Sequence, residues 1–187
     1  LISAGGTVAP GPGIATLVIS NNLTLAGNLL VEINKSIPAT NDFLIVSGLL
    51  TSAGVGVVTP LNLGTNALLA GDRFKLFNQP VLNGGALTIG ATPGVNWTNR
   101  LALDGTIEVL SVVNLAPPNV MATTAGGNLN FSWPADHIGW RLEVQTNALS
   151  SGLRTNWSTW TGSAATNAVT IPISAASPAV FFRLAYP

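Results

Sequence analysis

The residues best suited to catalysis are few, and His137 is the single histidine of the chain. It follows Asp136 directly and lies five residues after Ser132, so the three residue types of a Ser-His-Asp triad occur close together. A triad needs an acid that orients the imidazole, which is awkward for an adjacent Asp. No Gly-x-Ser-x-Gly nucleophile elbow is present. We therefore interpret His137 as a turn residue, with Asp136 capping the same turn.

The acidic side chains offer a second kind of chemistry, because glycoside hydrolysis uses two facing carboxylates. The acids are Glu32, Asp42, Asp72, Asp104, Glu108, Asp136 and Glu143. Asp104 and Glu108 are an open alternative for such a pair. Asp42, Asp72 and Asp104 fall at expected strand starts or turns, where Asp satisfies local backbone groups. We predict no enzymatic activity and no catalytic residues.

Cofactor and metal sites have no support in the sequence. There is no cysteine, so neither a thiolate metal site nor a disulfide is possible. Neither an EF-hand loop nor a calcium-binding glycine repeat occurs. The glycine-rich stretches are not followed by the Lys-Ser/Thr pair of a phosphate loop. We predict no cofactor and no metal.

Tryptophan is concentrated near the C-terminus, and aromatic faces can stack on sugars. Arg154, Trp157 and Trp160 are candidates for a shallow ligand groove. A spacing of three places Trp157 and Trp160 on opposite faces of a regular strand, so at least one belongs to the core. We favour core packing for Trp133, Trp140 and Trp157, because a small module needs aromatic burial.

The overall composition indicates an ordered, all-β protein. Of 187 residues, 47% are hydrophobic and only 7% charged, and the formal net charge is zero. Nucleic-acid binding and a polybasic membrane patch are disfavoured, since both require clustered Lys and Arg. Polarity comes from Thr, Asn, Ser and 20 Gly, which suit strands joined by tight turns. We predict more than about 35% strand and under about 10% helix, against base rates of about 20–25% and 30–35%.

One long uncharged stretch, residues 43–71, raises the alternative of a membrane-spanning helix. Its glycines and Pro60 favour strands instead, so we predict no transmembrane segment. No basic segment precedes an apolar core at the N-terminus, and the first residue is Leu1. We expect a processed chain whose export signal lies upstream and which is secreted or displayed at the cell surface.

An internal repeat appears when the chain is compared with itself at an offset of 27. Residues 17–20 match 44–47, residues 23–24 match 50–51, 26–27 match 53–54, and 30–31 match 57–58. A period of this length indicates a solenoid, in which each coil of short strands buries its inner face on its neighbours. The alternative is a chance match between similar strands of a β-sandwich.

Further strands are expected beyond the repeat. They are residues 72–77, 86–89 and a hairpin of 101–103 and 106–110, then 129–133, 140–146, 155–161, 168–173 and 180–185. The run at 114–119 contains Pro117 and Pro118, which suit a stiff linker. We predict a solenoid-like domain at 1–113, a linker at 114–119, and a small β-sandwich of the fibronectin-III kind at 120–187.

Particular motifs carry a family resemblance. Residues 41–48, 70–77 and 95–109 resemble the end of an autotransporter-associated β-strand repeat region, found in long bacterial surface proteins. Residues 131–134, 139–142, 156–157, 169–173 and 181–184 are similar to a C-terminal module of secreted proteins in Verrucomicrobia-like bacteria. The resemblance implies export, surface display and a structural or adhesive role, and it supplies no catalytic residues.

We expect a non-enzymatic extracellular structural protein that self-associates through β-contacts into head-to-tail polymers. The first strands carry no charge and no protecting Lys or Pro, although natural sheet edges are normally protected. The candidate contact residues are Ala15, Leu17, Val18, Ile19, Leu23 and Leu25. The alternative is a carbohydrate-binding or adhesive module of a longer surface protein, with glycans as partners.

Overall fold

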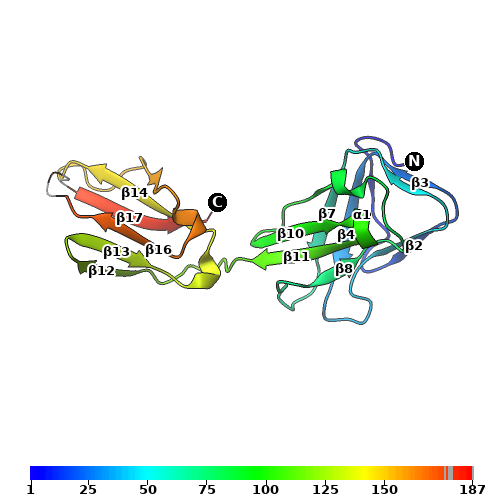
Figure 1. Ribbon diagram of the computed structural model, residues 1–187, viewed down its shortest axis with the longest axis horizontal. Coiled ribbons are helices and arrows are strands. Elements are labelled where there is room, and N and C mark those ends of the chain that lie inside the picture. Colours follow the sequence, from blue (N-terminus) through cyan, green and yellow to red (C-terminus); the bar gives the residue numbers. More distant parts are fainter. Residues whose placement is uncertain (175, 177–178, 187) are drawn as a thin grey trace. The chain divides into compact units, whose positions relative to one another are not determined.

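The chain is mostly β, which confirms the all-β prediction. The computed structural model describes residues 1–174, 176 and 179–186. Strands account for 45% and helices for 7%. The chain divides into two compact units, Leu1–Val112 and Val113–Pro187 (Figure 1).

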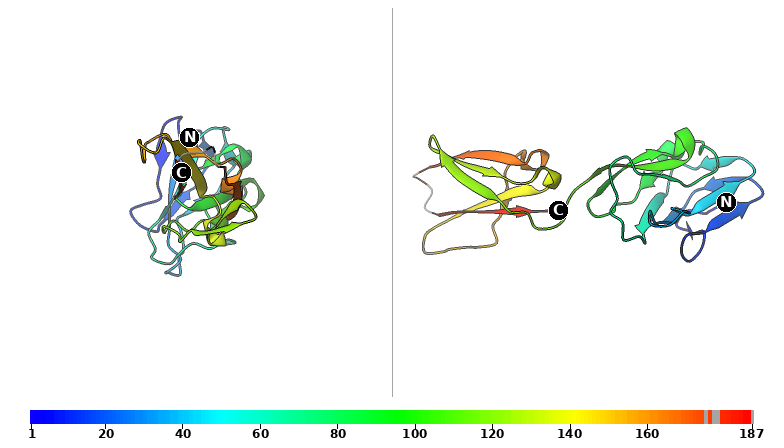
Figure 2. Two further views of the ribbon diagram at one scale, coloured as in Figure 1. Left: turned by 90° about the vertical axis from the view of Figure 1, so that its left-hand side faces the viewer. Right: turned by 90° about the horizontal axis from the view of Figure 1, so that it is seen from below.

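Most strands of the first unit are parallel and come from successive passes of the chain. The strands are β1 (Thr7–Val8), β2 (Thr16–Ile19), β3 (Leu23–Leu25), β4 (Asn28–Ile33), β5 (Phe43–Val46), β6 (Leu50–Ser52), β7 (Val57–Asn62) and β9 (Thr88–Ile89). The first pass, β2 to β4, lies beside the second, β5 to β7, so that β2 pairs with β5, β3 with β6 and β4 with β7 (Figure 2). A last pass, residues 77–89, adds single parallel bridges at Phe77 and Leu82 and the strand β9.

The 27-residue repeat sets the register of two of these pairings. Thr16 pairs with Phe43 and Leu23 with Leu50, each 27 residues apart. In the third pairing Leu29 lies opposite Val58, an offset of 29. The predicted alignment of 30–31 with 57–58 is therefore wrong by two residues, because the second pass has a longer corner before β7. A shift of two leaves the inward and outward faces unchanged, since side chains alternate with period two.

Inward-facing side chains of these passes form one continuous core. Alternate residues of β4 are buried, and Leu25, Leu44 and Leu50 from neighbouring passes are almost inaccessible. Burying such a side chain contributes about 1.5–3 kcal/mol. One pass alone has no partner for this apolar face, so the passes are stable only when stacked.

Asparagine side chains join one pass to the next at the corners. Asn22 Oδ1 accepts the Leu49 N–H at 2.8 Å, and Asn28 Oδ1 accepts the Val57 N–H at 3.0 Å. These bonds satisfy backbone donors where the chain bends away from its ladder, which explains why a chain poor in charge is rich in Asn.

The end of the first unit is antiparallel. It contains β8 (Arg73–Lys75), η1 (Gly84–Ala86), β10 (Val95–Arg100), α1 (Leu101–Asp104) and β11 (Thr106–Val112), with the strands ordered β10-β11-β8. The prediction of a strand at 101–103 is wrong, because these residues form α1. Asn99 Oδ1 accepts the Leu101 N–H at its start, and Gly105 closes it with φ +76°.

The second unit contains two three-stranded antiparallel sheets. One is ordered β12 (Met121–Ala125), β13 (Asn128–Ser132), β16 (Ala168–Pro172), and the other β15 (Ser158–Thr159), β14 (Arg141–Asn147), β17 (Ala179–Ala185). Short helices η2 (Ala135–His137) and η3 (Ser163–Ala165) lie between strands. The Phe131 and Phe182 rings, one from each sheet, lie 4.6 Å apart between centroids, and Leu142 and Ile171 belong to the same buried cluster. The predicted strand at 155–161 is reduced to the two residues of β15.

Candidate functional site

Strand β2 has an open edge. It pairs with β5 on one side, and within the described part of the chain no strand pairs with its other side. Residues 2–8 do not cover it, because Ile2 bridges Leu25 and β1 pairs with β4. The edge carries no charged side chain, and Val18 is 60% exposed. An uncharged open edge is a template for another strand.

A buried carboxylate fixes the start of β2. Asp42 is fully buried; its Oδ1 accepts the Ala15 N–H and its Oδ2 the Glu32 N–H, both at 2.8 Å. Asp42 lies at the start of β5, as predicted, but the backbone groups that it satisfies are not local, since they are 27 and 10 residues away. The sequence feature that could have indicated this contact is the spacing, since Asp42 lies 27 residues, one repeat length, after Ala15.

The six predicted self-association residues fall into two groups. Val18 is exposed, Ala15 is half-buried, and Leu17 and Ile19 are half-buried, the last two against the core. Leu23 and Leu25 are only 4% and 1% exposed, so their side chains cannot contact another molecule. These two residues are corrected to core positions, because the strand β3 turns both leucines inward.

The far end of the parallel stack is covered by the chain itself. The Phe77 N–H donates to Gly105 O, and the Val81 N–H donates to Leu101 O. Asn99 Nδ2 donates to the carbonyls of residues 84 and 87. Several residues of the last pass that would receive a neighbour in the predicted head-to-tail stacking thus already have intramolecular partners, and the stacking stays a prediction.

A charged cluster lies on the outer face of the second sheet of the second unit. Glu143 Oε1 accepts from Arg141 Nε at 3.0 Å and its Oε2 from Arg183 Nε at 2.7 Å. The Arg183 guanidinium lies 4.3 Å from the ring centroid of Trp157. Burial acts to raise the pKa of Glu143, but the two arginines outweigh it and the pKa is lowered.

The predicted ligand groove of Arg154, Trp157 and Trp160 is not assembled. Trp157 packs under Arg183 on the outer face, whereas Trp160 packs against the apolar cluster between the sheets. The expectation that the two indoles lie on opposite faces holds, but the preference for Trp157 as core residue is wrong. Trp133 and Trp140 are buried, as predicted. Arg154 is exposed, and its backbone exchanges two hydrogen bonds with the Gln145 side chain.

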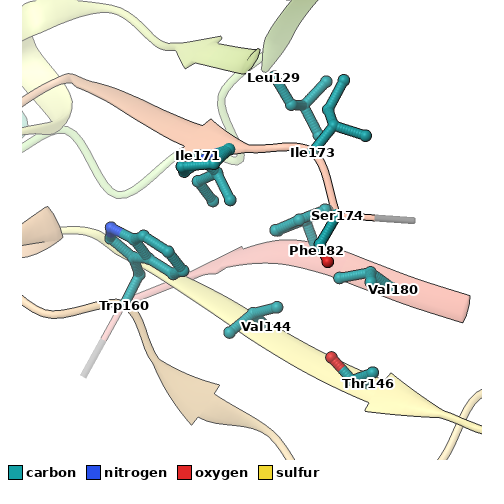
Figure 3. A pocket seen from close by; sticks show the side chains of 10 residues that line it. Leu129, Val144, Thr146, Trp160, Ile171, Ile173, Ser174, Val180 and Phe182 are labelled. Carbon is teal, nitrogen blue, oxygen red and sulfur yellow. The ribbon is translucent and has the colours of Figure 1, made fainter. Parts of the chain in front are cut away.

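An apolar cleft of about 400 Å³ opens between the two sheets. Figure 3 shows Leu129 and Ile171 from one sheet and Val144, Trp160 and Phe182 around it. No charged side chain lines it among the described residues. The cleft continues the core of the unit, so the sequence signal for these residues is the same apolar alternation that marks the core.

His137 is buried, at 4% exposure, and both ring nitrogens are engaged. Nδ1 lies 2.7 Å from Asp136 Oδ1, and Nε2 lies 2.8 Å from the Ala116 carbonyl. Hydrogen bonds from Asn114 and His137 lower the pKa of Asp136. His137 lies in the turn of η2, as predicted, but Asp136 does not cap that turn and accepts from Asn114 Nδ2 instead. The Nε2 contact attaches residues 114–116, part of the predicted linker, to the rest of the second unit. Neither nitrogen is left to activate a nucleophile.

Asp104 and Glu108 do lie near one another, around Arg100. The Arg100 Nε is 3.6 Å from Asp104 Oδ2 and 3.5 Å from Glu108 Oε2. The Thr106 hydroxyl hydrogen-bonds to Asp104 and lowers its pKa. A general acid for glycoside cleavage needs a raised pKa, so this arrangement favours an ion-pair role.

Comparison with known proteins adds no assignment. No protein-family model matches the chain, no curated protein does, and no solved structure does. Within residues 1–174, 176 and 179–186, no three His, Cys, Asp or Glu side chains are grouped to hold a metal ion. No helix of the same residues is long and apolar enough to cross a membrane.

Proposed function

We propose that this chain is a non-enzymatic extracellular structural protein that self-associates through β-contacts. In this proposal the first unit is the end of a β-solenoid of the autotransporter-associated repeat kind, and the second is a small β-sandwich of the fibronectin-III kind. The parallel pairing at a 27-residue offset supports the solenoid. The two antiparallel sheets around Phe131 and Phe182 support the sandwich.

The single observation that carries the proposal is the open edge of β2. The far end of the stack is already covered by Leu101 and Gly105, so a second copy reaches this edge through its own β2. Antiparallel pairing about a two-fold axis through Val18 places Val18 opposite the same residue of the second copy and Leu17 opposite the second copy's Ile19. No like charges meet, and zero net charge leaves little long-range repulsion.

Sedimentation velocity of the chain over a wide concentration range tests this contact. We expect Val18→Lys to lower the mean sedimentation coefficient. The ammonium group introduced at position 18 would be desolvated in the β2 contact and would lie close to the same group of the second copy. Leu110→Lys is the matched control, since Leu110 is similarly exposed, at 65%, but lies on β11. An effect of equal size in both variants, or in neither, contradicts the proposal.

Glycan binding is the second candidate, and the Arg141–Glu143–Arg183–Trp157 cluster is the observation that favours it. Two guanidiniums around one carboxylate leave a net positive charge beside an indole. Such a face suits an acidic saccharide better than a neutral one. Titration calorimetry with acidic and neutral oligosaccharides, compared between the parent and Arg183→Gln, tests it; no heat with either class contradicts it.

A further inference from the structure

Strand β12 is unusually exposed for a strand of a packed unit. All five residues, Met121–Ala125, are exposed, and Met121 reaches 66%. Within the described ranges β12 pairs with β13 alone, so its second edge is open. An edge strand normally buries every other side chain against the facing layer, and β12 does not.

The strand also lacks the features that normally protect an edge. No Lys, Arg, Asp or Glu occurs anywhere in residues 109–135, and no proline lies within β12. Natural edges are protected by charge, proline, a bulge or a covering segment. The β12–β13 pairing runs without interruption over five residue pairs, so the edge is regular and open to strand addition.

Hollows lie beside this edge. One, of about 210 Å³, is lined by Val120 and Ala122 together with Phe131 and Leu142. The other, of about 370 Å³, is lined by Met121 together with Trp133 and other neighbours. Ala122 and Met121 are adjacent in the strand and point to opposite faces of the sheet. Side chains of an added strand alternate between the same two faces, so both sets have space to pack.

We propose that a second copy of the chain pairs antiparallel with this edge, β12 to β12, about a two-fold axis through Thr123. Met121 then lies opposite the second copy's Ala125, and Ala122 opposite its Thr124. Each larger side chain meets a smaller one, Thr123 meets itself, and no like charges are opposed. Two three-stranded sheets become one six-stranded sheet.

The β12 contact extends the proposed function. Its consequence, a filament, rests on the proposed β2 contact. A β2 contact and a β12 contact are each isologous, so either alone gives only a closed dimer. When both contacts are present on one chain, β2–β2 and β12–β12 contacts alternate along a row of copies, which produces an open filament. A polymer can therefore form without head-to-tail stacking on the covered far end of the first unit.

Three variants measured by sedimentation separate the two contacts. We expect the parent to form species larger than a dimer, Val18→Lys and Thr123→Lys each to stop at dimer, and the double variant to be monomeric. A monomeric Val18→Lys variant overturns the β12 contact and leaves the proposed function standing. A monomeric Thr123→Lys variant beside a dimeric Val18→Lys variant overturns the β2 contact instead. A double variant that still dimerises overturns the β12 contact.

A cysteine provides a second readout that does not depend on tolerance of lysine. The chain has no cysteine, so Thr123→Cys introduces one thiol at the proposed axis. Antiparallel pairing brings paired Cα atoms to about 4.5–5.5 Å, within the range that a disulfide spans. We expect rapid covalent dimers under mild oxidation. Thr170→Cys on β16, the other edge of the same sheet, is the matched control and should remain monomeric by non-reducing electrophoresis. Equal dimer yields from both variants overturn the proposal.

Discussion

Replacing Asp42 by Asn tests whether one buried carboxylate holds the open strand β2 in place. Asp42 is fully buried and accepts two backbone N–H groups, from Ala15 and Glu32. Asn retains one acceptor oxygen and turns an N–H₂ group toward the other donor. One charge-assisted bond is lost and the other becomes neutral, so we expect the first unit to lose about 3 kcal/mol.

Urea unfolding followed by Trp97 fluorescence measures this loss, because Trp97 is the single tryptophan of the first unit. With a slope of about 1.5 kcal/mol per molar urea, the midpoint should fall by about 2 M. The Val18→Lys, Thr123→Lys background removes assembly from the comparison. Hydrogen exchange should show the amides of β2 losing protection before those of β5.

Asp72→Asn is the matched control for this substitution. Asp72 also accepts two hydrogen bonds, from Leu69 N–H and Lys35 Nζ, but its side chain is 21% exposed. Solvent replaces what it loses, so a cost of about 1 kcal/mol or less is expected. Equal urea midpoints for the two Asn variants, or unchanged exchange at β2 in Asp42→Asn, would refute the role assigned to Asp42.

Two further predictions concern backbone geometry and pH. Gly56→Ala should destabilise the first unit by about 3 kcal/mol, because Gly56 has φ +113° and an added Cβ would lie 2.1 Å from Gly27 O. Gly71→Ala, with φ +91° but open space, should cost about 1 kcal/mol in the same urea assay, and equal costs would contradict the steric reasoning. Because the pKa of folded Glu143 is lowered, the second unit should lose stability as pH falls below the ordinary value of 4.5. Glu143→Gln should make acid unfolding less steep, leaving the part due to Asp136; an unchanged slope would contradict the Arg183 contact.

The repeat could be predicted from sequence because its physical cause is local. Strands such as β2 and β5 need the same apolar alternation to face one core, so matching residues recur after one pass. The register of β4 against β7 could not be predicted to the residue. A corner can gain two residues without moving any side chain to the other face, so the pattern of burial does not report the change.

The candidate contact residues also include features that the sequence predicts and features that only the tertiary structure decides. The absence of charge around Val18 is a property of the sequence, and it is enough to indicate an unprotected edge. Three other features depend on which segments become neighbours: the inward direction of Leu23 and Leu25, the packing of Trp160 rather than Trp157 in the core, and the bond from Ala15 to Asp42.

The all-β class, the 27-residue spacing and the uncharged first strands all follow from side-chain size, branching and charge along the chain, so the amino-acid order is sufficient to predict them. Which edges stay open depends instead on the tertiary fold. The segment of β10, α1 and β11 folds back over the last pass and supplies its hydrogen-bond partners, whereas nothing in the described residues does so for β2 or β12. The pairing of an edge depends on long-range neighbours, and composition or periodicity in one segment carries no record of them.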